Sequence, residues 1–228
     1  MPPTDIQLYD TTLRDGMQGE GMSLSTEEKL RVVHRLDALG IDLIEAGFAA
    51  SNPKDLELLE QLGSERLEHA QIAAFGMTRR RDLAADADPA LRTLAQCSVP
   101  VCTLVGKSWS LHLEKVVRVD PEENLRMIAD SVAFLVGQGK RVIYDAEHFF
   151  DGYRDDADYA LRCLRAAADA GAETVVCCDT NGGSLPPFIT TAMTRVVAEL
   201  ASGAAAIGIH CHDDSDCGTA NTLAAVEA

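Results

Sequence analysis

Basic residues are scarce in this sequence, in which 20 Lys and Arg stand against 36 Asp and Glu for a formal net charge of −16. A surface this acidic repels nucleic acid and anionic lipid, so we exclude both as main partners. No apolar run approaches the length that crosses a membrane. The opening residues MPPTDIQLYD lack a basic stretch followed by an apolar one, so no signal peptide is predicted.

A disulfide framework is also missing from the sequence. The seven cysteines are odd in number, form no CxxC pair and mostly lie in apolar runs such as TVVCCDT. Buried thiols in a reducing compartment fit this usage, and we therefore expect a cytoplasmic protein. Hydrophobic residues make up 46% of the chain, which is an ordinary share for a globular protein with a real core.

What the sequence does contain is a regular alternation of short apolar runs and longer helical patterns. Helix starts are predicted at Ser25 with Glu28, which form a capping box, and at Asn52-Pro53 and Asp120-Pro121. A further helix is predicted over 156–171. The apolar runs suit buried parallel strands and cover residues 6–10, 42–48, 71–76, 100–106, 141–147, 174–180 and 206–212.

This order of elements predicts a parallel α/β sheet with right-handed crossovers. An open doubly wound sheet and a closed barrel both satisfy it. We favour a TIM-type (β/α) barrel, because polar residues follow nearly every strand and a barrel gathers all these strand ends into one mouth. Such a barrel has eight strands and about 250 residues. We find seven strands, and therefore expect residues 1–228 to form a single barrel domain that is incomplete at its C-terminus and has no regulatory domain.

The sequence HCH at residues 210–212 is the sharpest local feature. Residues two apart in a strand point the same way, so His210 and His212 are expected to face one side together. Asp15, after the first strand, is the natural third ligand, although it could instead pair with Arg14; adjacent residues at a strand end usually point apart. Two imidazoles and a carboxylate with open positions predict a divalent ion of the Mg, Mn, Co or Zn kind.

Other charged residues also follow the predicted strands. Arg14 is suited to holding a carboxylate or enolate oxygen. Glu45 and Glu147 are strand-end acids, which in a barrel indicate catalysis more often than structure. Lys107 and the three arginines at 79–81 are isolated basic residues in an acidic sequence. They are either solvated side chains or residues that assist the binding of a polyanionic substrate such as a coenzyme A ester.

The stretches DTTLRDGMQGEG and HCHDDSDCGTANTLAAVEA, with the strand ends between them, resemble the metal-dependent Claisen-condensing and lyase barrels. That superfamily includes 2-isopropylmalate synthase, homocitrate synthase, citramalate synthase and hydroxymethylglutaryl-CoA lyase. The stretches SNPKD, KSWSLH, YDAEHFFDGY and CDTNGG are most similar to the citramalate synthase branch. The resemblance covers nearly the whole chain from Leu8 onward. No match is found for an Asn ligand that the family supplies after its eighth strand.

The resemblance implies a role for each matching residue. Members of the branch condense acetyl-CoA with pyruvate on the route to isoleucine, and a homodimer is expected for the full-length protein. Alternatives that stay open are 2-isopropylmalate or homocitrate synthesis, carbon–carbon cleavage of a hydroxyacyl-CoA, and an inactive fragment. The implied metal ligands are Asp15, His210 and His212; the implied substrate and catalytic residues are Arg14, Gln18, Glu45, His112, Glu147 and Thr180.

Overall fold

The structure, a computed structural model, describes residues 6–201 and 203–228. Its strands form one parallel sheet in the order β1-β2-β3-β4-β5-β6-β7, so each strand pairs with the next along the chain. The strands are β1 (Tyr9–Asp10), β2 (Leu43–Phe48), β3 (Gln71–Met77), β4 (Val101–Lys107), β5 (Arg141–Glu147), β6 (Thr174–Asp179) and β7 (Ala206–Cys211).

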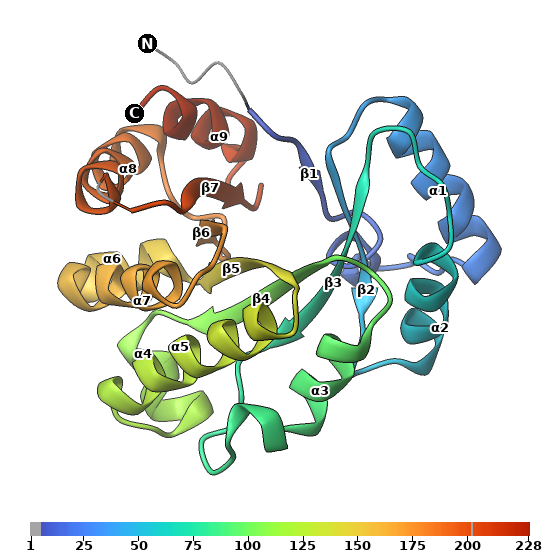
Figure 1. The fold of residues 1–228 in the computed structure, drawn as a ribbon. Helices are drawn as coiled ribbons and strands as arrows, with labels where there is room; N and C mark the ends of the chain where they lie inside the picture. The colour runs from blue at the N-terminus through green and yellow to red at the C-terminus, as the bar shows by residue number, and fades with distance from the viewer. Residues whose placement is uncertain (1–5, 202) are drawn as a thin grey trace.

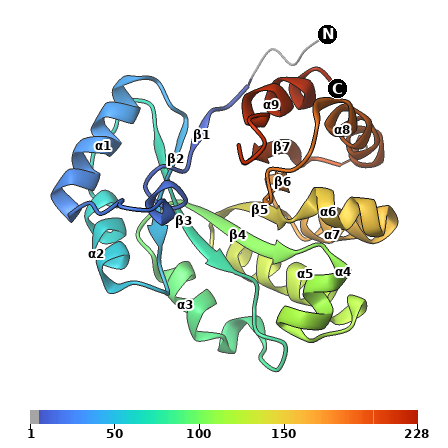
Figure 2. The same cartoon turned by 180° about the vertical axis from the view of Figure 1, so that it is seen from behind.

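The sheet curls so that the helices lie outside it and its two end strands, β1 and β7, approach the same side of the molecule (Figures 1 and 2). Within the described residues these two strands are not paired with each other, and no eighth strand lies between them. The prediction of a TIM-type architecture with seven βα units is therefore confirmed.

Helices connect the strands and cover the outer face of the sheet. The two predicted Pro-led starts are confirmed, because the Asn52 and Asp120 side chains accept backbone N–H bonds at the first turns of their helices. The helices are α1 (Thr26–Ala38), α2 (Pro53–Leu62), α3 (Pro89–Gln96), α4 (Ser110–His112), α5 (Pro121–Gly137), α6 (Phe149–Asp155), α7 (Ala157–Asp169), α8 (Pro186–Leu200) and α9 (Gly218–Val226).

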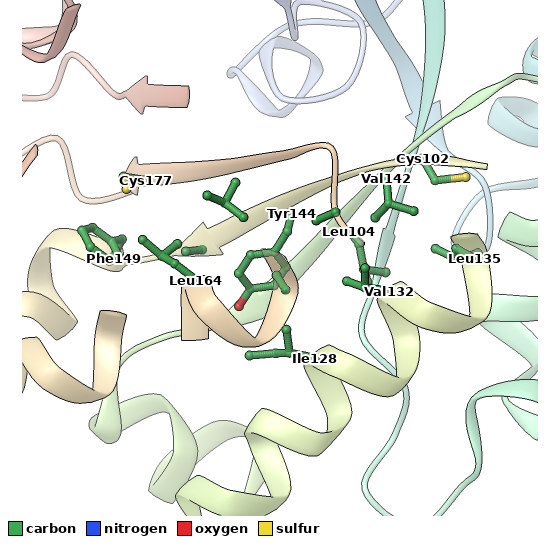
Figure 3. Packing of buried hydrophobic residues seen from close by; sticks show 14 of the residues in the cluster. Cys102, Leu104, Ile128, Val132, Leu135, Val142, Tyr144, Phe149, Leu164 and Cys177 are labelled. Atoms are coloured by element: carbon green, nitrogen blue, oxygen red, sulfur yellow. The ribbon is translucent and has the colours of Figure 1, made fainter. Parts of the chain in front are cut away.

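The main hydrophobic core lies between the helices and the outer face of the sheet. On α5, Ile128, Val132 and Leu135 are fully buried and face strand residues such as Leu104 and Tyr144 (Figure 3). Residues of the opposite parity point to the inside of the curl and form a second, small cluster of Leu43, Ala73, Val101, Ile143, Val176 and Cys178. Because strand side chains alternate, the residues that follow these inner positions toward the carboxyl ends also face the lumen.

Three sequence expectations need correction. The first strand is limited to Tyr9–Asp10, and Ile6 and Leu8 are more than half exposed. Helices α3 and α8 were not predicted. Arg79 is not a solvated side chain, since it is 6% exposed and binds Glu123 and Asp130.

In the part of the chain that the structure describes, no helix is both long and apolar enough to cross a membrane.

Five of the seven cysteines are buried and all seven are free thiols. Burial raises the pKa of Cys102 and Cys163 to about 12, so these thiols stay protonated and unreactive at neutral pH.

Candidate metal and substrate site

Three of the predicted residues meet at the carboxyl end of the sheet, between its first and last strands. His210 lies in β7, His212 follows it directly, and Asp15 lies in the turn after β1. The Nε2 atoms of His210 and His212 are 3.5 Å and 3.4 Å from Oδ2 of Asp15. The two imidazole rings stack with their centroids 5.0 Å apart, so both face the same carboxylate.

The spacing of these three side chains suits a single divalent ion. Their ligand atoms all lie within 4.8 Å of one another, and two ligands that are each about 2.1 Å from one metal are roughly 3.0–3.4 Å apart. Burial, and then the neighbouring His212, lower the pKa of His210, which favours the neutral imidazole that binds metals. The donor set therefore fits the ion that the sequence predicts.

Arg14 lies beside this triad and is held by two acids. Its Nε donates to Oε2 of Glu45 at 2.5 Å, and its Nη1 is 3.3 Å from Oδ1 of Asp15. Burial alone would lower the pKa of Arg14, but the carboxylates of Glu45 and Asp15 raise it above its ordinary value. The expectation that Arg14 and Asp15 point apart is wrong, because they lie in a turn rather than in a strand and their charged groups meet.

Glu45 holds Arg14 in position through an ion pair. Its side chain is fully buried in the lumen, where the Tyr9 hydroxyl donates to its Oε1 at 3.0 Å and also contacts the Thr103 hydroxyl. A buried carboxylate is costly unless it is paired and hydrogen-bonded, and these contacts supply both conditions. Glu45 thus fixes the position of the guanidinium next to the triad.

Sequence reasoning assigned no role to Asp145, which lies in the same layer of the lumen. Its side chain is almost fully buried, and its carboxylate lies within 4.8 Å of the ligand atoms of Cys178 and His210. Burial and the nearby Glu45 carboxylate raise the pKa of Asp145 to about 8. The signal that could have found it is its spacing, since Asp145 and Glu147 are two apart in one strand and share a face.

Glu147 and Thr180 lie at the neighbouring strand ends. Glu147 ends β5 and forms an ion pair with Lys107, which ends β4. The Thr180 hydroxyl accepts a hydrogen bond from the backbone N–H of His148 at 2.9 Å. The sequence left Lys107 open as either a solvated side chain or a contact for a polyanionic substrate, and only the pairing of β4 with β5 reveals Glu147 as its partner.

His112 and Gln18 are the two remaining predicted residues. His112 packs in an aromatic cluster, with ring centroids 5.1 Å from Trp109 and 4.5 Å from His148. Burial, followed by His148, lowers the pKa of His112. Gln18 ends a short 3₁₀ turn and is exposed, and its side chain makes no hydrogen bond to another residue in the described part of the chain. His112 therefore lies close enough to Lys107 and Glu147 to be affected by their charges, and Gln18 forms no hydrogen bond to the triad among the described residues.

A lumen enclosed by parallel βα units, with its polar side chains gathered at the carboxyl ends of the strands, defines the class of TIM-type (β/α) barrels. The sequence profile of the HMGL-like family matches residues 5–228. The chain belongs to the HMGL-like family.

Curated relatives in this family include several (R)-citramalate synthases. The one from Geobacter sulfurreducens is 47% identical over 221 residues, which cover 97% of this chain and 41% of the relative. The one from Synechocystis sp. is 49% identical over 230 residues, which cover 99% of this chain and 42% of the relative. The chain thus spans about two fifths of the length of these relatives.

Solved structures with the same fold include HMG-CoA lyases. The enzyme from Brucella melitensis superposes with a TM-score of 0.76 at 15% identity, covering 97% of this chain and 77% of the other. The enzyme from Pseudomonas aeruginosa also gives a TM-score of 0.76, at 20% identity, covering 98% and 73%. At these identities the likeness shows the fold alone.

Proposed function

We propose that the natural full-length protein carrying this chain condenses acetyl-CoA with pyruvate to form citramalate and free coenzyme A. The observation that carries this proposal is the 44–49% identity to (R)-citramalate synthases over nearly the whole chain. The site supports it, because a triad suited to a divalent ion lies next to a buried arginine. The protein would act in the cytoplasm, as its cysteine usage predicts. As the resemblance implies, it would act as a homodimer on the route to isoleucine.

Asp15, His210 and His212 would hold the divalent ion. When bound, such an ion polarises a carbonyl oxygen and stabilises the charge that develops on it. Arg14 would bind the 2-oxo acid and share that charge, because a guanidinium has five N–H donors and Glu45 occupies only the Nε donor. Glu45 and Phe75, whose ring lies 4.1 Å from the guanidinium carbon, would keep Arg14 oriented before substrate arrives.

Glu147, His112 and Thr180 belong to the acetyl-CoA side of the site in this proposal. Glu147 and His112 would act near the reacting methyl group, and Thr180 would line the substrate. Gln18, in the short turn after Asp15, would line the substrate on the side of β1. A methyl group next to a thioester is weakly acidic, so its proton can be removed only if the developing oxyanion is stabilised at the same time.

Substrate choice provides the test of this proposal. The purified full-length protein, supplied with acetyl-CoA and a divalent metal, is expected to release thiol with pyruvate at least about tenfold more efficiently than with 2-oxoisovalerate, since small differences in side chain are worth one or more kcal/mol in a fitted pocket. Thiol release is followed with a chromogenic thiol reagent, and a reaction without 2-oxo acid is the control. Preference for the branched acid would move the assignment to 2-isopropylmalate synthesis.

A further inference from the structure

Lys107 and Glu147 form an ion pair at the mouth of the lumen. The two residues are register partners at the carboxyl ends of the adjacent strands β4 and β5. They share the inner parity of Val101 and Ile143, which lie in the lumen cluster, so both side chains face the site. Their side chains are 13% and 27% exposed, which means that solvent reaches the pair only in part.

Buried side chains hold both strand ends in place. The Asn124 side-chain amide donates to the carbonyl oxygen of Lys107 at 2.8 Å, and the Ser108 hydroxyl donates to the carbonyl oxygen of Glu147 at 2.8 Å. Asn124 is 1% exposed and Ser108 is fully buried. A surface ion pair would not need this support, whereas a catalytic pair needs side chains that start from fixed backbone positions.

The site has two cations on opposite sides of the lumen. Arg14 follows β1, where Glu45 and Asp15 hold it next to the triad and the 2-oxo acid would bind. Lys107 ends β4, and its ammonium group has three N–H donors. Among the described residues only Glu147 accepts from it, so two donors are left for an incoming group.

We infer that Lys107 is a further catalytic residue, whose ammonium group binds the thioester oxygen of acetyl-CoA and stabilises the charge that develops there when Glu147, in the role that the proposed function gives it, takes the methyl proton; this inference rests on the proposed function. The Glu147 carboxylate takes the proton, the electron pair of the C–H bond forms a carbon–carbon double bond, and the carbonyl pair moves to the thioester oxygen. The resulting enolate carbon then attacks the keto carbon of the 2-oxo acid. The proton on Glu147 passes through solvent to the new hydroxyl group, and water later cleaves the thioester to release the thiol.

The ion pair lowers the electrostatic cost of this step. Before proton transfer the negative charge lies on Glu147, and afterwards it lies on the thioester oxygen, within reach of the same ammonium group. Lys107 therefore keeps a negative partner throughout, and no isolated charge forms in the partly buried site. An uncharged side chain at position 107 would leave the enolate oxygen without a donor.

The test is the Lys107→Met variant of the full-length protein, assayed with acetyl-CoA and with acetyl-CoA carrying a trideuterated methyl group. Loss of one oxyanion donor is expected to lower kcat about 10²–10³-fold. Because proton removal becomes the slow step, the deuterium isotope effect on kcat should rise above the wild-type value. Lys107→Arg should restore part of the rate. Lys115→Met, which removes an exposed lysine paired with Glu114 in the helical turn after α4, should leave kcat and the isotope effect unchanged.

Two other outcomes for the Lys107→Met variant would contradict the inference. If Lys107→Met turns over within a few-fold of wild type, Lys107 binds no reacting oxygen. If its kcat falls without a rise in the isotope effect, the lysine has only a structural role. Both results leave the proposed function intact, because wild-type turnover is measured in the same experiment. A wild-type protein with no activity toward any 2-oxo acid would overturn the proposed function and this inference together.

Discussion

Replacing His212 with Gln is expected to lower the kcat of the full-length protein roughly a thousandfold, since a bound metal contributes several kcal/mol to the stabilisation of developing charge. The reason lies in the triad, where the Nε2 of His212 is 3.4 Å from the Asp15 carboxylate and shares that group with His210. An amide oxygen at position 212 is a weaker ligand for most of the candidate ions. The measurements are kcat and the metal content of the dialysed protein, and both should fall.

His34→Gln is a matched control, because it removes a histidine that is not part of the triad. His34 lies on α1, is half exposed and is 3.8 Å from Glu65 on the protein surface. His34→Gln should leave kcat and metal content at the wild-type values. Full metal content together with wild-type turnover in His212→Gln would contradict the assignment of the triad as the metal site.

Replacing Arg14 with Met should affect both stability and activity. Glu45 is fully buried, and without the guanidinium its carboxylate has no cation beside it among the described residues. Breaking a buried ion pair by removing one partner costs about 3–5 kcal/mol in the free energy of unfolding. Urea denaturation measures this loss, and turnover should fall as well, since the 2-oxo acid loses its binding group.

Two further variants test the cause. Arg14→Met combined with Glu45→Gln removes both charges, so it should recover most of the stability while activity stays lost. Arg141→Met removes one partner of the more exposed pair with Glu173, and it should cost no more than about 1 kcal/mol. If Arg14→Met costs as little as Arg141→Met, the buried pair does not stabilise the fold as described.

Much of the architecture could be predicted because local chemistry and tertiary structure agree. The Asn52 and Asp120 caps, each followed by proline, mark helix starts that need no distant contact. Helix α8 was missed for the opposite reason. It contains Thr190, Thr191 and Thr194, whose hydroxyls bond to carbonyl oxygens four residues earlier, and threonine favours a helix only weakly. Packing of Ile189, Met193 and Val196 in the core stabilises it instead. Their spacing of i, i+4 and i+7 is the signal that could have revealed this helix.

The candidate site was also predictable only in part from the sequence. The period of two in HCH is a local property, and the structure brings both histidines to Asp15. The contact between Arg14 and Glu45 joins residues 31 positions apart, and the one between Lys107 and Glu147 joins residues 40 positions apart. These pairs depend on which strands are neighbours and in what register, so sequence alone could suggest the residues but not their partners.

The most direct test of the account is to identify the product by NMR. The full-length protein, freed of metal with a chelator and then dialysed, is incubated with acetyl-CoA and ¹³C-labelled pyruvate before and after a divalent metal is restored. We predict that labelled citramalate forms only after the metal is restored. Absence of citramalate with the metal present, or equal formation without it, would contradict the account.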